Sequence, residues 1–168
     1  RLHPMQRQVM AGQILYPFER ARDVLETFAE YAPRQPDALD LGPVLTQPRG
    51  GGAAVAGFGV CWSGDADRTE QALAPIRRLG DPIMDSVGPM DYVAVQRSGD
   101  VSDPRAVGQY VKSGFIPELP PALISAIVEG FEGGPGRDTI VAFQQSGGAI
   151  GRVAPEATAF AQRDAMAN

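Results

Sequence analysis

The most constraining feature of this sequence is a helical pattern set between strand-like segments. From Phe18 to Ala32, apolar residues recur at i, i+3, i+4 and i+7 with charged residues between them, and Pro33 ends the run. The apolar stripe comprises Ala21, Val24, Leu25, Phe28, Ala29 and Ala32. A helix of this kind buries one face, so we expect a sheet to pack against the stripe.

The segments on either side of this helix predict strands. Residues 8–16 form a short apolar run that ends at Pro17. Residues 38–46 and 53–62 predict a hairpin, because the glycine-rich segment 47–52 between them is typical of a turn. Pro43 inside the first hairpin strand favours an edge position or a bulge.

The second half predicts a similar order of elements. Helices are expected over residues 66–79, capped by Ser63-Gly64-Asp65, and over residues 121–131, ended by the glycines of 133–136. Between them, residues 81–99 indicate a short strand or turn and then one or two helical turns, and residues 100–105 a loop. Further strands are expected over 109–116, 139–145 and 149–153, with Gly147-Gly148 as the last turn.

This order predicts an α+β fold. It contains two βαββ-like units in a ferredoxin-like arrangement, which implies a mostly antiparallel sheet with the helices packed on one face. The 168 residues are enough for one such domain.

Composition excludes several classes of function. The net charge of -5 repels phosphate backbones, so we expect no nucleic-acid partner. No apolar run approaches the ~18 residues of a membrane span, so we expect no membrane partner. The sequence does not show directly where the parent protein is located, and our expectation is the cytoplasm. One cysteine and one histidine are too few for a structural zinc site or for a disulfide within the chain.

The familiar catalytic and cofactor motifs are also missing. The glycines at 50–52 lie in a hairpin and those at 133–136 end a helix, so neither group offers a helix N-terminus to a pyrophosphate. A Ser-His-Asp triad would have to use His3, near the start of the chain. Cys61 lies in an apolar run and is interpreted as a small buried hydrophobe.

Polar residues on the expected strands are the remaining candidates for a site. Tyr110 and Lys112 are two residues apart and would share one face, Gln144 and Gln145 would point to opposite faces, and Arg152 would lie on the last strand. One interpretation is a solvated sheet face. The other interpretation is a pocket lined by a few polar side chains and covered by a partner domain.

A series of short motifs resembles a known enzyme family in order and spacing. The motifs are Tyr16-Pro17, Arg20-Ala21, Ala72-Leu73-Ala74-Pro75-Ile76, Gly88-Pro89-Met90-Asp91-Tyr92, Tyr110-Val111-Lys112-Ser113, Gly147-Gly148-Ala149 and Thr158-Ala159-Phe160-Ala161-Gln162-Arg163-Asp164. Together they resemble the bacterial members of the berberine bridge enzyme-like FAD oxidases, the family of 6-hydroxynicotine oxidase. The resemblance runs across essentially the whole chain.

The resemblance implies that residues 1–168 are the substrate-binding domain, whose antiparallel sheet covers the flavin of a separate FAD-binding domain. That second domain is expected to lie outside this chain, which alone would be inactive and would hold no FAD. The full-length parent would be an FAD-dependent oxidoreductase that transfers a hydride from a substrate C–H bond to FAD, with electrons passing to oxygen or another acceptor. Its partners would be a small-molecule substrate and its own FAD-binding domain.

The resemblance also suggests site residues. Gln144 matches a pocket-facing position of the family, and Tyr110 and Lys112 lie in a motif that bears a lysine. Asn168 falls near the position of the plant family's catalytic glutamate, but an amide cannot act as a general base near neutral pH. Two alternatives stay open: a free-standing ferredoxin-like small-molecule binding module that pairs with a second copy through its open sheet face, and a purely structural interaction domain.

Overall fold

The computed structural model describes residues 5–47, 52–100, 110–132 and 139–168. His3 and Gln109 fall outside these ranges, as do most of the expected turn at 47–52, the loop at 100–105 and the glycines at 133–136. The strands are β1 (Gln8–Pro17), β2 (Leu39–Thr46), β3 (Val55–Trp62), β4 (Met84–Asp85), β5 (Gly88–Asp91) and β6 (Ile140–Ala142). The α-helices are α1 (Ala21–Tyr31), α2 (Thr69–Arg77), α3 (Tyr92–Arg97) and α4 (Pro121–Glu132), and short 3-10 turns are η1 (Phe18–Arg20), η2 (Ala32–Arg34), η3 (Ala66–Arg68) and η5 (Pro155–Ala157).

The strands form one sheet in the order β4-β1-β3-β2-β6, with β5 also paired to β1. Every pairing between these strands is antiparallel. The predicted α+β fold with a mostly antiparallel sheet is therefore confirmed. The first βαββ unit consists of β1, α1 and the β2–β3 hairpin, as the sequence predicts.

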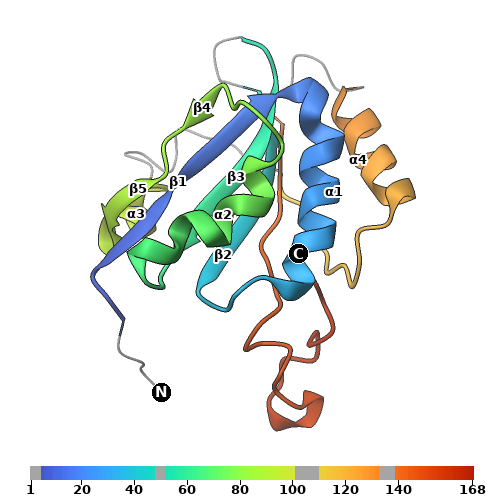
Figure 1. The fold of residues 1–168 in the computed structure, drawn as a ribbon. Helices are drawn as coiled ribbons and strands as arrows, with labels where there is room; N and C mark the ends of the chain where they lie inside the picture. Colours follow the sequence, from blue (N-terminus) through green and yellow to red (C-terminus); the bar gives the residue numbers. More distant parts are fainter. Residues whose placement is uncertain (1–4, 48–51, 101–109, 133–138) are drawn as a thin grey trace.

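One face of the sheet carries the hydrophobic core. Strand alternation places Ile14, Phe58 and Leu41 on the same face, and all three are fully buried. Helices α1, α2 and α4 lie on this side of the sheet (Figure 1). Phe28 of α1 is also fully buried, and its ring centroid lies 6.0 Å from that of Phe143. The predicted amphipathic stripe of residues 18–32 is confirmed as the centre of this core.

Hydrogen bonds from tyrosine and arginine side chains hold α2 against the rest of the core. The hydroxyl of Tyr31 donates to the carbonyl of Ala72 over 2.8 Å, and that of Tyr16 donates to the carbonyl of Ile76 over 3.2 Å. Arg20 donates to the carbonyl of Leu79 over 2.7 Å. These bonds join α2 and the residues just after it to β1, η1 and α1.

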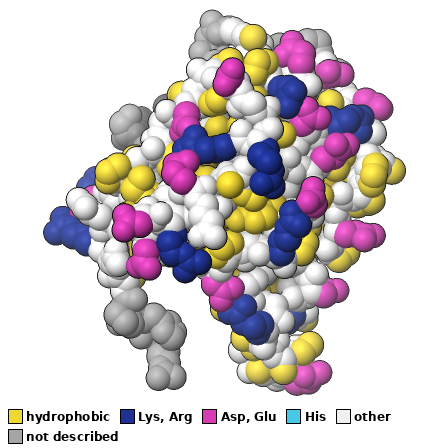
Figure 2. Space-filling view, in the orientation of Figure 1, with side chains coloured by type: hydrophobic (Ala, Val, Ile, Leu, Met, Phe, Trp, Pro, Cys, Tyr) yellow, Lys and Arg dark blue, Asp and Glu magenta, His cyan; other side chains and the backbone are white. Residues whose placement is uncertain are grey.

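The exposed side of the helices is charged. Arginine and acidic side chains are interspersed over it (Figure 2). Several of them form ion pairs, such as Arg34 with Glu30 at 2.6 Å and Arg77 with Glu70 at 2.9 Å. Pairs of this exposure contribute little stability each, and they leave this surface without a concentrated charge of one sign.

Two predicted strands are wrong, and both errors concern the edge beyond β6. Residues 110–115 form no strand, and only Ile116 pairs, in a single bridge with Ala167. Residues 149–153 form turns, with Gly148 at φ 63°. Residues 166–168 instead occupy the edge of residues 144–146, with which 149–153 was expected to pair. Gln144 and Ser146 donate their backbone N–H groups to Asn168 and Met166, each over 2.9 Å.

Two smaller expectations also differ. The side chains of Ser63 and Asp65 do not cap α2; Thr69 instead donates its hydroxyl to the carbonyl of Ala66 over 2.7 Å. Strand β2 is not an edge strand, because it pairs with both β3 and β6. Pro43 is tolerated in this strand because its hydrogen bond toward β6 uses its carbonyl and not an N–H. That carbonyl accepts from the N–H of Phe143 over 3.0 Å.

Candidate functional site

The sheet face opposite α1 carries a row of small and polar residues at its centre. Gln13 of β1 pairs with Gly59 of β3, and Gly59 pairs with Gly42 of β2. The register of β6 pairs Val44 with Ala142, so its continuation sets Gln144 beside Gly42. Gln13 and Gln144 are both exposed. Two glutamines therefore bracket a floor of two glycines.

The glycines of this face, Gly42, Gly57 and Gly59, form what we call the glycine strip. A Cβ added to Gly42 would lie 2.7 Å from the carbonyl oxygen of Phe143, and one added to Gly57 would lie 2.8 Å from the Cα of Leu15. Both positions therefore require glycine for steric reasons. A Cβ at Gly59 would approach nothing closer than 3.8 Å. The absence of a side chain at Gly59 has no cause within the described chain, and such a strand glycine often marks the close approach of a ligand or another backbone.

Helix α3 covers one end of this face. Val9 and Ala11 alternate with the core-facing residues of β1 and yet are buried, at 4% and 1% exposure. Helix α3 packs against β1 and β5. A cavity of about 290 Å³ remains beside α3, which we call the α3 cavity. It is lined by Met5, Asp37, Ala38, Leu39, Asp40, Cys61, Ser63, Tyr92, Val95, Gln96 and Gln145.

Two titratable groups lie side by side at the α3 cavity, the exposed Asp40 and the half-buried Cys61. Asp40 of β2 and Cys61 of β3 are direct cross-strand partners, one row from the Gly42–Gly59 pair. Burial raises the pKa of the Asp40 carboxyl, although this side chain keeps access to solvent at the rim. Burial, and then the charge of Asp40, raise the pKa of the Cys61 thiol. The thiol is therefore neutral at neutral pH and a poor nucleophile.

The structure brings some of the sequence-predicted residues together at another place. Lys112 and Asn168 line a pocket of about 350 Å³ at the sheet edge, together with Ser113, Gly114, Ile116, Ile127, Val141, Ala142 and Phe143. Gln144 is joined to Asn168 by two backbone hydrogen bonds of 2.9 and 3.0 Å. Tyr110 is 84% exposed and is not among these lining residues, although the amino group of Lys112 lies 5.9 Å from its ring centroid.

The other predicted residues have structural contacts. Gln145 points away from Gln144, as strand alternation requires, and its side-chain oxygen accepts a hydrogen bond from Gln35. Arg152 lies in a turn and forms an ion pair with Asp37, which lowers the pKa of that carboxyl. The sequence reasoning missed the glycine strip and the Asp40–Cys61 pair. The alternation of glycine with core residues at 57–60 was the available signal for the strip.

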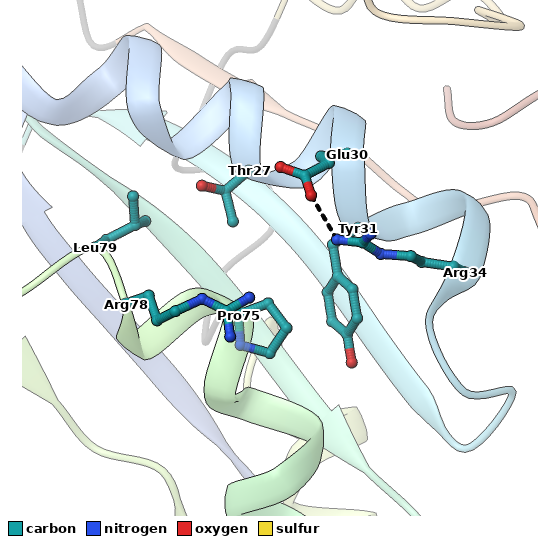
Figure 3. Close-up of a pocket in the computed structure, with 7 residues that line it drawn as sticks. All are labelled: Thr27, Glu30, Tyr31, Arg34, Pro75, Arg78 and Leu79. Carbon is teal, nitrogen blue, oxygen red and sulfur yellow. Dashed lines mark hydrogen bonds and ion pairs between the residues drawn. The ribbon is translucent and has the colours of Figure 1, made fainter.

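A third pocket, of about 200 Å³, lies in the crevice between α1 and α2. Figure 3 shows Thr27, Glu30 and Tyr31 of α1 on one side, with Arg34 just beyond that helix, and Pro75, Arg78 and Leu79 on the other. Arg34 forms an ion pair with Glu30, and the Tyr31 hydroxyl donates a hydrogen bond to the Ala72 carbonyl. The charged and aromatic groups on the α1 side thus already have structural partners.

Among the described residues, no group of three or more histidine, cysteine, aspartate or glutamate side chains could hold a metal ion. None of the helices in the described ranges is both long and apolar enough to cross a membrane. Comparison with models of protein families finds no match to this chain, and comparison with curated proteins finds none either. The case for a function therefore depends on the site itself.

Proposed function

We propose that this chain is the substrate-side domain of an FAD-dependent oxidoreductase, and that the part of the sheet face opposite α1 that α3 leaves open covers the flavin. The observation that carries the proposal is Gly59, a mid-strand glycine that no neighbouring atom requires. Glycine at such a position costs roughly 0.5–1 kcal/mol relative to alanine. A surface function that needs a bare backbone there explains why a larger residue does not fill the space.

The residues of this face fit a planar ring. The floor at Gly59 and Gly42 presents backbone only, and exposed amides at Gln13 and Gln144 can hydrogen-bond to polar ring edges. The described residues show no phosphate cradle, so the rest of a dinucleotide would belong to the separate FAD-binding domain. When bound, a flavin accepts a hydride from a substrate C–H bond and passes electrons to oxygen or another acceptor.

The part of this chain in that reaction is to exclude water, to orient the substrate and to line its pocket. The α3 cavity lies on the same face, one residue row from the glycine floor. Gln144 is the residue of this face that also matches the family motif, and we assign it to substrate contact. The single free thiol, Cys61, is compatible with a reducing compartment, and we place the parent enzyme in the cytoplasm.

Exposed apolar side chains on the same face favour a covering partner of some kind. Ile140, Met84 and Met90 are 62%, 39% and 37% exposed, and strand alternation places all three on the side of the sheet opposite α1. The second candidate function, a free-standing binding module, would cover them with another copy of this chain. Light scattering of the purified chain separates the two candidates, because a stable dimer supports the module and a monomer supports the missing FAD domain.

The decisive experiment uses the natural protein that contains this chain. It is expected to show flavin absorbance and to reduce that flavin with substrate. Gly59→Val should slow flavin reduction in anaerobic stopped flow without unfolding the protein, and Gln144→Ala should do the same. A natural protein without flavin, or a Gly59→Val variant with unchanged reduction, would contradict the proposal. Thr46→Val, which also places a valine on this face but adds no bulk, is the control at the end of β2.

A further inference from the structure

The pocket of about 350 Å³ at the sheet edge, which we call the edge slot, lies in line with residues 166–168. Ala167 pairs with Gln145 on one side and with Ile116 on the other, and both pairings are antiparallel. The strand that contains Ala167 therefore runs between two walls, which at this row are two strand spacings apart, roughly 9–10 Å. The edge slot opens directly beyond Asn168, which is one of its lining residues.

The other lining residues match the next three rows of the same register. In an antiparallel ladder, one strand advances by a residue as its partner steps back by one. The three rows beyond Asn168 therefore lie beside residues 141–143 on the β6 wall and beside residues 112–114 on the other wall. All six of these residues line the edge slot. The slot thus has the position and the register of a three-residue continuation of one strand.

Backbone groups of β6 point into the edge slot. The N–H of Phe143 donates to β2 over 3.0 Å, whereas both backbone groups of Gln144 bond to Asn168, over 2.9 and 3.0 Å. These directions alternate along a strand, so the N–H and C=O of Ala142 point to the same side as those of Gln144. On the other wall, no backbone hydrogen bond joins residues 112–114 to any other described residue. Backbone groups of this kind bind another extended peptide.

The side chains around the edge slot favour a strand with alternating polarity. Phe143 is buried and Val141 is half-buried, and both belong to the core face of the sheet. Ile127 of α4 lines the slot from this same side. Ala142 is exposed on the opposite face. A strand in the slot would therefore place its first and third side chains against apolar groups and its second side chain toward solvent.

We infer that the edge slot binds a peptide strand of this apolar-polar-apolar pattern, and that the strand is the parent protein's own segment continuous with Asn168. The slot is collinear with residues 166–168, so such a segment enters it without a turn. A tethered strand also binds at a high effective concentration, which a separate peptide lacks. The inference rests on the proposed function only because it takes this chain to be one domain of a longer protein.

The first test extends the 168-residue chain by three residues after Asn168. The extension Val-Thr-Val has the required alternation and consists of β-branched residues, which favour strands. It should raise the melting temperature by about 3–5 °C, since it adds ladder hydrogen bonds and buries two valine side chains. It should also slow hydrogen exchange of the Ala142 amide, measured by NMR, by about tenfold or more.

Two further extensions are the matched controls. Thr-Val-Thr uses the same residue types with the opposite alternation, and Val-Pro-Val lacks the middle N–H that the Ala142 carbonyl would accept. Both should give less than half of the shift in melting temperature, and both should leave exchange of the Ala142 amide close to that of the unextended chain. The melts are repeated over a tenfold range of protein concentration, because pairing between copies would make the shift depend on concentration.

The second test uses the natural protein that contains this chain. Its Ala142 amide should exchange about tenfold more slowly than that of the 168-residue chain, and proline at the second residue after Asn168 should restore fast exchange. Equal exchange in the two proteins would overturn the inference, as would protection that the proline leaves unchanged. Equal shifts for the three extensions, no shift for Val-Thr-Val, or a shift that depends on concentration would also overturn it. None of these measurements involves a flavin, so the edge slot and the flavin-covering role can fail separately.

Discussion

The hydroxyl of Tyr31 in α1 donates a 2.8 Å hydrogen bond to the carbonyl of Ala72 in α2. The phenol is 7% exposed, so the bond lies away from water. It joins α1 directly to α2. A buried bond of this kind has two consequences that can be measured.

Tyr31→Phe is expected to lower the free energy of unfolding by about 1 kcal/mol. The Ala72 carbonyl loses the hydrogen bond that it accepts from the Tyr31 hydroxyl, while the aromatic ring stays in place. Burial also raises the pKa of Tyr31, so the neutral phenol is favoured in the folded chain. Stability from this group is present below about pH 10 and is lost as the pH rises through the folded-state pKa. Urea titrations at pH 7 and pH 11 should therefore show a smaller cost of Tyr31→Phe at the higher pH.

Phe28→Ala is expected to be among the most costly single changes, at roughly 3–5 kcal/mol. The side chain is fully buried and its ring packs against Phe143. Phe115→Ala is the matched control, because Phe115 is 44% exposed and contacts the exposed ring of Phe160. Similar losses for the two variants in urea unfolding would contradict the position of Phe28 at the centre of the core.

The glycine strip predicts opposite effects at two positions of β3. Gly57→Ala should destabilise the chain, because the new Cβ would meet the backbone of Ile14 and Leu15. Gly59→Ala should stabilise it by roughly 0.5–1 kcal/mol, because the space is open and the unfolded chain loses freedom. Thermal melts of both variants measure this difference. A loss of stability at Gly59 would show that this glycine is structural and would remove the main support for the proposed function.

Asp40→Asn is expected to raise the melting temperature at pH 7 only slightly, because the Asp40 side chain is exposed and solvent screens most of the penalty on its charge. The raised pKa of Asp40 means that its contribution to stability is greatest below the pKa that aspartate has in the unfolded chain, and that it falls as the pH rises through the folded-state value. The gain should therefore disappear near about pH 3, where both states are protonated. A gain that is constant with pH would have another origin.

The isolated chain is expected to retain no FAD after purification. The reason is that the sheet face offers a flat floor and amides but no described group that binds phosphates. Equilibrium dialysis with FAD measures this directly. Near-stoichiometric retention would mean that the chain itself is the FAD-binding part, contrary to the proposed function.

The elements that were predictable from the sequence are those whose signal is local. The stripe around Phe28 and the hairpin of β2 and β3 follow from periodicity and turn composition within short windows. The edge strand was not predictable, because Ala165 to Asn168 are four residues with little pattern, and their pairing with Gln144 to Ser146 depends on distant contacts. The segment 149–153 looked like the natural partner of that edge by proximity alone.

The site was less predictable than the fold. The Asp40–Cys61 and Gly42–Gly59 pairs depend on the register of the β2–β3 hairpin, and a glycine-rich turn of uncertain length does not fix that register. Lys112 and Asn168 line the same pocket because residue 167 pairs with Ile116. A sequence shows which residues share a face of one strand, and it does not show which strands become neighbours.

The double pairing of Ala167 has a consequence for the order of events in folding. This residue bridges both Ile116 and Gln145, so it closes a gap between two segments that are otherwise not joined. During synthesis, the β1–β3 meander can form early, but the outer edge of residues 143–146 stays unpaired until residue 167 has left the ribosome. Until then, that edge is open to strand addition by another nascent chain. Closure of this edge is therefore a late step in the folding of the domain, because it waits for residue 167.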